Sequence, residues 1–257
     1  MRFGVCTDIH GIPAAVEAGY DYLELHFQVI VNMPDGEYEI LLNAVRQSGL
    51  KAECFNGFFP ADIPLVGPQV DFGKISEFTQ KGMQRAQQLG GKIVVLGSGT
   101  SRRIPEGFSR SKAYAQFQKA ITICGDIAQQ YGIQIAIEPL NPSETNLIHT
   151  VSDGVRLCQD VNHPAVGCLV DFFHFYKNGE ALEDITSAGK WIIHTHLARP
   201  NNDRQMPKEE DIPICRQWIQ VLKAMHYSGR MSLEGVFFPS FPQAITQTMD
   251  ILKQINN

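Results

Sequence analysis

The chain of 257 residues lacks several features that mark large classes of proteins. It has no lysine- or arginine-rich block, and its net charge of −5 argues against a nucleic-acid-binding surface, which would carry a basic face. It has no apolar run of the length that a membrane helix requires, and its start, MRFGVCTDIHG, enters a strand pattern without the apolar core of a signal peptide. We therefore expect a cytoplasmic protein with no nucleic-acid partner and no membrane partner.

Paired cysteine motifs and a nucleotide-binding turn are also missing. The six cysteines form no CxxC pair, and most fall within predicted strands or helices, so we expect reduced, mostly buried thiols. The segment LGSGTS at 96–101 has neither GxGxxG spacing nor the lysine of a P-loop. An open doubly wound sheet, which commonly carries such a turn, is therefore disfavoured.

What the chain does contain is a regular alternation of strand-like and helix-like segments. Helical spacing of apolar residues is seen at 37–49, 78–91, 113–132 and 154–161, and a last helix is expected from Pro242 to Ile255. The predicted strands are RFGVCTD (2–8), YLELHF (22–27), KAECFNGF (51–58), KIVVLGSG (92–99), IQIAIEPL (133–140), VGCLVDFFH (166–174), WIIHTHLA (191–198) and MSLEGVF (231–237). Eight such units predict a single α/β domain over residues 1–257, a (β/α)₈ TIM barrel.

Ionisable side chains close four consecutive predicted strands. Glu138 ends the fifth strand, Asp171 the sixth, His196 the seventh and Glu234 the eighth. Catalytic groups of TIM barrels lie at the carboxyl ends of the strands, so we expect these four to meet at one rim. Three carboxylates and an imidazole would be satisfied there by a divalent ion, which would leave positions for substrate oxygens. His194 shares a face with His196 but lies deeper in the strand, so His196 is the better rim candidate.

Taken one at a time, these residues also have an ordinary structural interpretation. A strand-terminal Asp often caps the next helix, and a histidine in a strand is commonly hydrogen-bonded rather than bound to metal. Asp8 and His10 after the first strand, and His26 at the end of the second, are open to the same two interpretations: they line a pocket, or they cap and hydrogen-bond locally.

From the fifth strand onward the sequence resembles the sugar 3-epimerases of the tagatose and psicose (allulose) type, within the xylose-isomerase-like TIM barrels. Two residue spacings match this family in addition to the four strand-end residues. Glu144 lies six residues after Glu138, and His174 lies three residues after Asp171. The resemblance implies that one divalent ion, Mn²⁺ in preference to Mg²⁺ or Co²⁺, is bound by Glu138, Asp171, His196 and Glu234. It also implies that Glu144 and His174 face the substrate.

The resemblance further implies a reaction, in which Glu138 and Glu234 serve as the catalytic acid and base. They would exchange a proton on opposite faces of a free ketose and invert C3 through a metal-stabilised enediolate. Relatives bind substrate with an arginine after the seventh strand. Arg204 in HLARPNNDRQMP is the nearest counterpart, slightly displaced, and Arg199 is its competitor. The partner would be a small sugar, and a homodimer or homotetramer is compatible with this interpretation.

Other functions stay open at this point. Hydroxypyruvate isomerases and inosose dehydratases share the same metal and carboxylate arrangement. A DNA-repair enzyme resembling endonuclease IV would need additional histidines after the third and fourth strands, where the chain has Asn56 and Ser98. A non-catalytic sugar-binding barrel would be expected to have lost at least one of the four strand-end residues.

Overall fold

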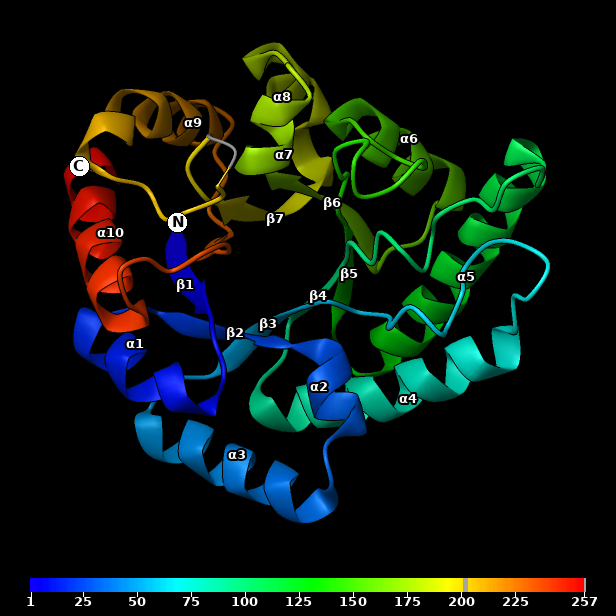
Figure 1. The fold of residues 1–257 in the computed structure, drawn as a ribbon, viewed down its shortest axis with the longest axis horizontal. Coiled ribbons are helices and arrows are strands. Elements are labelled where there is room, and N and C mark those ends of the chain that lie inside the picture. Colours follow the sequence, from blue (N-terminus) through cyan, green and yellow to red (C-terminus); the bar gives the residue numbers. More distant parts are fainter. Residues whose placement is uncertain (201–202, 257) are drawn as a thin grey trace.

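The computed structural model describes residues 1–200 and 203–256 and shows eight parallel strands closed into a barrel (Figure 1). Each strand pairs with the next in sequence, and β8 pairs with β1 to complete the ring. The strands are β1 (Arg2–Cys6), β2 (Tyr22–His26), β3 (Ala52–Asn56), β4 (Ile93–Leu96), β5 (Gln134–Ile137), β6 (Val166–Asp171), β7 (Ile192–Leu197) and β8 (Arg230–Leu233). The predicted (β/α)₈ TIM barrel is confirmed.

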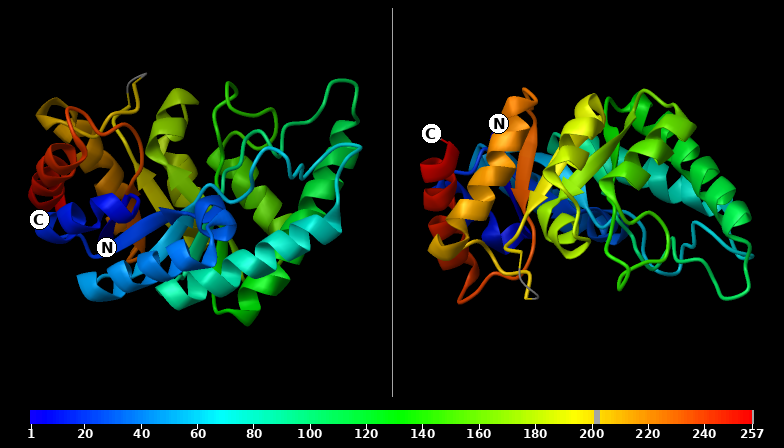
Figure 2. Two further views of the ribbon diagram at one scale, coloured as in Figure 1. Left: turned by 60° about the horizontal axis from the view of Figure 1, so that its bottom comes forward. Right: turned by 90° about the horizontal axis from the view of Figure 1, so that it is seen from above.

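Helices surround the strands on the outside of the barrel (Figure 2). The α-helices are α1 (Ile12–Ala18), α2 (Phe27–Asn32), α3 (Asp35–Ser48), α4 (Phe72–Leu89), α5 (Arg110–Gln130), α6 (Val151–Val161), α7 (Phe172–Lys177), α8 (Leu182–Ala188), α9 (Ile212–Ala224) and α10 (Phe241–Asn256). Short 3₁₀ turns η1 (Ile9–Gly11), η2 (Gly189–Trp191) and η3 (Glu209–Asp211) precede α1, β7 and α9. Within the described ranges, no helix combines the length and apolar character needed to cross a bilayer.

The predicted sixth strand, 166–174, is too long at its carboxyl end. Its run of aromatic residues suggested a strand, but β6 ends at Asp171 and Phe172 begins α7. The reason is local: Oδ1 of Asp171 accepts hydrogen bonds from the backbone N–H groups of Phe173 and His174, which caps the helix. The predicted second strand overran similarly by one residue, because Phe27 is the first residue of α2.

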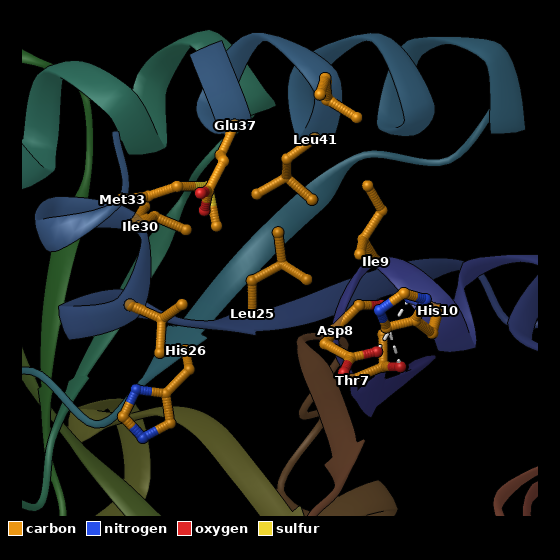
Figure 3. Close-up of a pocket in the computed structure, with 12 residues that line it drawn as sticks. Thr7, Asp8, Ile9, His10, Leu25, His26, Ile30, Met33, Glu37 and Leu41 are labelled. Atoms are coloured by element: carbon orange, nitrogen blue, oxygen red, sulfur yellow. Dashed lines mark hydrogen bonds between the residues drawn. The ribbon is translucent and has the colours of Figure 1, made fainter. Parts of the chain in front are cut away.

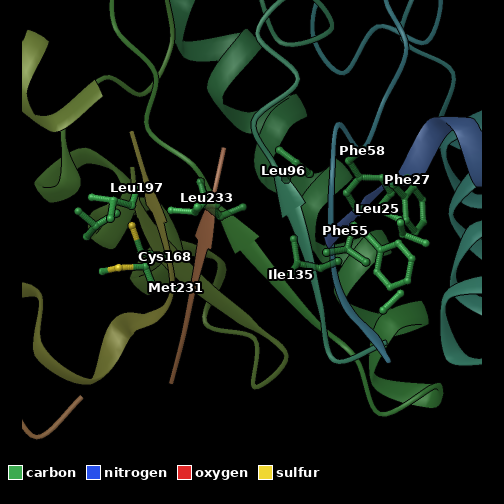
Figure 4. Close-up of a cluster of buried hydrophobic side chains, with 14 of the residues drawn as sticks. Leu25, Phe27, Phe55, Phe58, Leu96, Ile135, Cys168, Leu197, Met231 and Leu233 are labelled. Carbon is green, nitrogen blue, oxygen red and sulfur yellow. The ribbon is translucent and has the colours of Figure 1, made fainter. Parts of the chain in front are cut away.

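Side chains divide between the two faces of the sheet. Those pointing outward pack under the helices, and Figure 4 shows part of this layer, with Phe27, Phe55 and Phe58 gathered on one side of the barrel. A smaller apolar cluster fills the barrel interior, formed by Tyr22, Cys54, Ile93, Val95, Ala136 and Leu169. Polar residues of the same inward face therefore sit above an apolar floor, toward the carboxyl ends of the strands.

All six cysteines are free, as expected, and five of them are buried. Burial raises the pKa of the Cys54 and Cys168 thiols well above the ordinary value. These thiols therefore stay protonated and act as small hydrophobic groups.

A tight contact inside the barrel gives the first prediction. A Cβ on Gly4 would lie 2.2 Å from Cε2 of the buried Tyr22 ring, so Gly4→Ala should lower the free energy of unfolding by about 1–3 kcal/mol. Gly36→Ala is the matched control, because nothing lies within 4 Å of its Cβ position in α3, and alanine favours a helix by up to about 1 kcal/mol. Urea denaturation measures both. Equal effects of the two variants would contradict the interior contact.

Candidate active site

Four ionisable side chains meet at the carboxyl ends of β5 to β8. Glu138 follows β5, Asp171 ends β6, His196 lies in β7 and Glu234 follows β8. One ligand atom from each lies within 4.8 Å of the others. The exposed fractions of Glu138, Asp171 and His196 are 6%, 3% and 0%, whereas the Glu234 side chain is 18% exposed, so three members are buried and the fourth faces the mouth. The structure thus brings together the four residues expected at one rim.

The surrounding chain holds these carboxylates in place. Gly97 leaves room for Glu138, because a Cβ there would lie 2.2 Å from Oε2 of the carboxylate. The fully buried Arg102 donates a 2.7 Å hydrogen bond to the backbone carbonyl of Glu138. On the other side of the cluster, Nδ2 of Asn56 donates a 2.6 Å hydrogen bond to Oε1 of Glu234.

The environment separates the pKa values of the two glutamates. Burial raises the pKa of Glu138, and the nearby Glu234 and Asp171 carboxylates raise it further. Burial also acts to raise the pKa of Glu234, but His196 and Arg204 outweigh it and hold that pKa well below its ordinary range. Two carboxyl groups with opposite pKa shifts can act as a proton donor and a proton acceptor in one site.

Arg204 supplies a cation to the cluster. One guanidinium nitrogen, Nη2, lies 2.6 Å from Oδ2 of Asp171 and 2.7 Å from Oε2 of Glu234, and the guanidinium stands over the Phe173 ring. The competing candidate, Arg199, instead pairs with Glu210 and Asp211 near the start of α9. Of the two arginines considered from the sequence, Arg204 is the one that reaches the centre.

His174 points a single N–H group into the same space. Its Nδ1 accepts hydrogen bonds from the backbone N–H and the side-chain amide of Asn141, so Nε2 carries the proton. That Nε2 has no hydrogen-bond partner and lies 4.0 Å from the carboxylates of both Glu138 and Asp171. Asn141 also donates to Glu144, whose Oε1 is 3.8 Å from Nδ1 of His174. Glu144 and His174 are therefore neighbours at the mouth, as the spacing suggested.

Glu24 is the principal residue that the sequence interpretation missed. It lies on the inward face of β2, has no exposed surface, and accepts hydrogen bonds from Nε2 of His194 and Nε2 of His196, each of 2.9 Å. Nε2 of His196 is thereby engaged, and its Nδ1, which has no hydrogen-bond partner, faces the cluster at 3.0 Å from Glu234. The alternation of Tyr22, Glu24 and His26 in YLELH was the available signal, because it places a carboxylate inside the barrel.

Of the three residues near the first two strands, Asp8 has both of the roles considered, and His10 and His26 line a groove beside the mouth. The Asp8 side chain accepts from the backbone N–H groups of His10 and Gly11 and so caps η1. Asp8 also lines the groove.

The Arg204 contacts give a second prediction. Arg204→Gln leaves Asp171 and Glu234 without this cation, and the metal-free protein should lose about 2–3 kcal/mol of unfolding free energy at pH 7, less than for a wholly buried pair because the arginine side chain is 23% exposed. Arg204 lowers the pKa of both carboxyls in the folded state, so its contribution is present above their ordinary pKa of about 4 and is lost as the pH falls through their folded values.

Urea denaturation of chelator-treated protein between about pH 7 and about pH 2 measures this loss, because the two folded pKa values lie below the ordinary value of about 4. Arg199→Gln is the matched control, because its partners Glu210 and Asp211 lie outside the cluster. A loss for Arg204→Gln that stays constant over this pH range would contradict the assigned ion pairs.

Known proteins with similar sequences include a family of TIM barrels and several sugar epimerases and isomerases. A family model described as the xylose isomerase-like TIM barrel matches residues 12–255. An inosose isomerase from Bacillus licheniformis is 34% identical over 133 residues, which are 48% of this chain and 47% of the relative. An L-ribulose 3-epimerase from Methylomonas sp. is 23% identical over 87% of this chain and 77% of its own. Several other curated relatives, including D-psicose 3-epimerases, match over less than half of their length.

Solved structures share the same fold. A D-psicose 3-epimerase crystallised in the presence of D-fructose superimposes with a TM-score of 0.85 at 17% identity, covering 99% of this chain and 98% of the other. At this identity the structural likeness establishes the barrel alone. The match of the family model spans nearly all of the sequence, and the chain therefore belongs to the xylose isomerase-like TIM barrel family.

Proposed function

We propose that the protein is a metal-dependent sugar epimerase that inverts C3 of a free ketose. The observation that carries the proposal is the cluster of Glu138, Asp171, His196 and Glu234, in which buried ligand atoms converge while Oε1 of Glu138 and Nδ1 of His196 have no hydrogen-bond partner. Three carboxylates and one imidazole fit a divalent ion such as Mn²⁺, Mg²⁺ or Co²⁺. The ion would polarise neighbouring carbonyl and hydroxyl oxygens of the sugar and so acidify the C–H bond between them.

The two glutamates would carry the proton. Glu234, whose pKa is low, is ionised and suited to accept the proton from C3. Glu138, the carboxyl group at the end of β5, would return a proton to the opposite face of the same carbon. The reverse reaction exchanges these roles, because a 3-epimerase must act on both epimers.

His174, Glu144 and Arg204 would orient the sugar. The Nε2–H group of His174 is a buried donor aimed at the cluster, and Glu144 is a partly exposed acceptor beside it. Arg204 would bind a sugar oxygen beside the cluster that its guanidinium contacts in this structure. Fixing the substrate by several oxygens lowers the barrier because the reacting carbon is held against both carboxyl groups.

The named relatives support a reaction of this class. They include L-ribulose and D-psicose 3-epimerases, inosose isomerases and a 3-dehydro-D-guloside 4-epimerase from Escherichia coli. Each of these names describes rearrangement at or beside a carbonyl-bearing sugar carbon. A reaction that removes a proton next to the carbonyl is the chemistry they share.

Deuterium exchange tests the reaction. The Mn²⁺-loaded protein is incubated in D₂O with a panel of ketohexoses and ketopentoses, and NMR locates the label. Deuterium at C3 with an inverted product is expected. Label at C1 or C2 with aldose formation would make the protein an isomerase, and loss of water would make it a dehydratase. Absence of carbon-bound exchange in every sugar would contradict the proposed acid and base.

Metal removal gives the third prediction. Exhaustive chelation should abolish turnover, Mn²⁺ should restore it, and elemental analysis should find one ion per chain in the reloaded protein. Asp171→Asn should lose the ion. Glu144→Gln is the matched control, because it changes a carboxylate outside the cluster and should retain the ion while raising KM. Full activity in a sample shown to be metal-free would exclude the metal site.

Glu24 gives the fourth prediction, as a positioning residue. By accepting from Nε2 of His196 it favours the tautomer whose Nδ1 lone pair faces the cluster. Glu24→Gln keeps the side-chain volume but replaces one of the two acceptor oxygens with an NH₂ donor, so the dissociation constant for Mn²⁺ should rise about 10- to 100-fold.

Calorimetric titration with Mn²⁺ measures this effect. Ser232→Ala is the control, because it removes another buried hydrogen bond of the barrel interior, the 2.8 Å contact with Tyr22. Ser232 lies opposite His196 in the pairing of β7 with β8, but its hydroxyl bonds to Tyr22 and not to the imidazole. An equal loss of Mn²⁺ affinity in both variants would mean that Glu24 acts through general stability only.

A further inference from the structure

A groove beside the barrel mouth takes no part in the chemistry proposed above. It lies between the turn after β1 and helices α2 and α3, and it encloses about 350 Å³. Leu25, Ile30 and Leu41 line it although they are only 2%, 1% and 3% exposed, so they form its floor. Val29 and Ile40 also line it and are 50% and 62% exposed, as at a rim. Two large apolar side chains are thus left in water beside an apolar hollow.

The groove has a mainly apolar end and a polar end. Figure 3 shows Leu41, Met33 and Ile30 above Leu25, with the Glu37 carboxylate beside Met33. Below Leu25, Thr7 and Asp8 lie at the lower right and His26 at the lower left. The polar residues follow β1 and β2 at the rim of the barrel that carries the cluster.

The polar end adjoins Glu234 by two routes. In the pairing of β1 with β8, Val5 lies opposite Leu233, so the residues after Val5 run beside Glu234. In addition, Asn56 is bonded to Glu234, and the next residue, Gly57, packs so closely on His26 that a Cβ would lie 2.3 Å from the imidazole ring. His26 therefore stands between the groove and the cluster.

We infer that this groove binds an apolar substituent of the substrate, attached at the end of the sugar remote from its carbonyl. The inference rests on the proposed function, since it extends the same site. A hollow of this volume falls within the range of about 300–1,000 Å³ that small-molecule sites occupy. At its mainly apolar end the exposed Glu37 offers a carboxylate, but the floor of Leu25, Ile30 and Leu41 cannot satisfy sugar hydroxyls, which are costly to bury without hydrogen bonds. An alkyl or aryl group gains by leaving water against that floor.

The charged residues that line the groove restrict the class of ligand that it can bind. Asp8 and Glu37 are the charged side chains along the groove, and no lysine or arginine lines it among the residues that the structure describes. A phosphate group would meet negative charge without a cation to balance it. The substrate class is therefore a neutral ketose derivative with an apolar substituent, such as an ether or glycoside.

The test measures binding as a function of alkyl length. Calorimetry with the Mn²⁺-loaded protein compares D-psicose and D-fructose with their 6-O-butyl and 6-O-hexyl ethers. Affinity should rise about two- to fourfold for each added methylene, the range expected for partial to complete burial. No gain with length, while the parent ketose binds, would overturn the inference and leave the proposed function intact.

Substitutions at the rim of the groove test whether the affinity gained from the alkyl group arises there. Val29→Asp and Ile40→Asp change exposed residues, so they should fold normally, abolish the gain with alkyl length and leave the affinity for the parent ketose unchanged. Val16→Asp is the matched control, because Val16 is an apolar residue of α1, 42% exposed, that does not line the groove.

Two further outcomes would overturn the inference. If both rim variants dissociate an oligomer and leave the alkyl gain unchanged, the groove is a contact between copies of the chain. If no ketose binds with or without an alkyl group, while Mn²⁺ does, the proposed function and the inference both fail.

Discussion

The mutual repulsion of three buried carboxylates is the constraint that the upper half of this barrel has to satisfy. Glu138, Asp171 and Glu234 converge in a largely buried space, where charges interact more strongly than at a surface. His196 and Arg204 counter part of that charge. Burial, together with the remaining charge of Glu234 and Asp171, raises the pKa of Glu138. Under the proposed function, a bound cation and a substrate would complete the arrangement and offset its cost.

The inward face of the barrel is organised in levels that suit this constraint. Apolar side chains such as Ile93, Val95 and Leu169 fill the deeper part. Glu24 and the two histidines form a hydrogen-bonded level above them, and the open cluster lies at the mouth. A rigid, packed floor prevents the polar groups from relaxing away from one another. The cost in stability of burying a carboxylate at Glu24 is offset by two charge-assisted hydrogen bonds.

The fold and most of the cluster could be predicted from the sequence because both depend on local periodicity. Strand alternation and the position of strand ends place Glu138, Asp171, His196 and Glu234 at one rim without knowledge of any distance. The spacing also indicated Glu144 and His174. It could not distinguish Arg204 from Arg199, because both lie in a loop whose path depends on contacts with Asp211 and Val236. Glu24 and Asn56 were missed for a related reason, since their partners lie 172 and 178 residues away.

The two carboxylate oxygens of Asp171 make different contacts. Oδ1 holds the first turn of α7 through the amides of Phe173 and His174, while Oδ2 faces Arg204 and the cluster. A longer carboxylate side chain at this position could contact the cluster only if it no longer capped α7. An amide side chain of the same length could still cap α7 but would carry no charge. If these residues bind the proposed ion, its preference could be redesigned more freely at Glu138, whose side chain caps no helix, than at Asp171, where a change to the carboxylate also changes the backbone of α7.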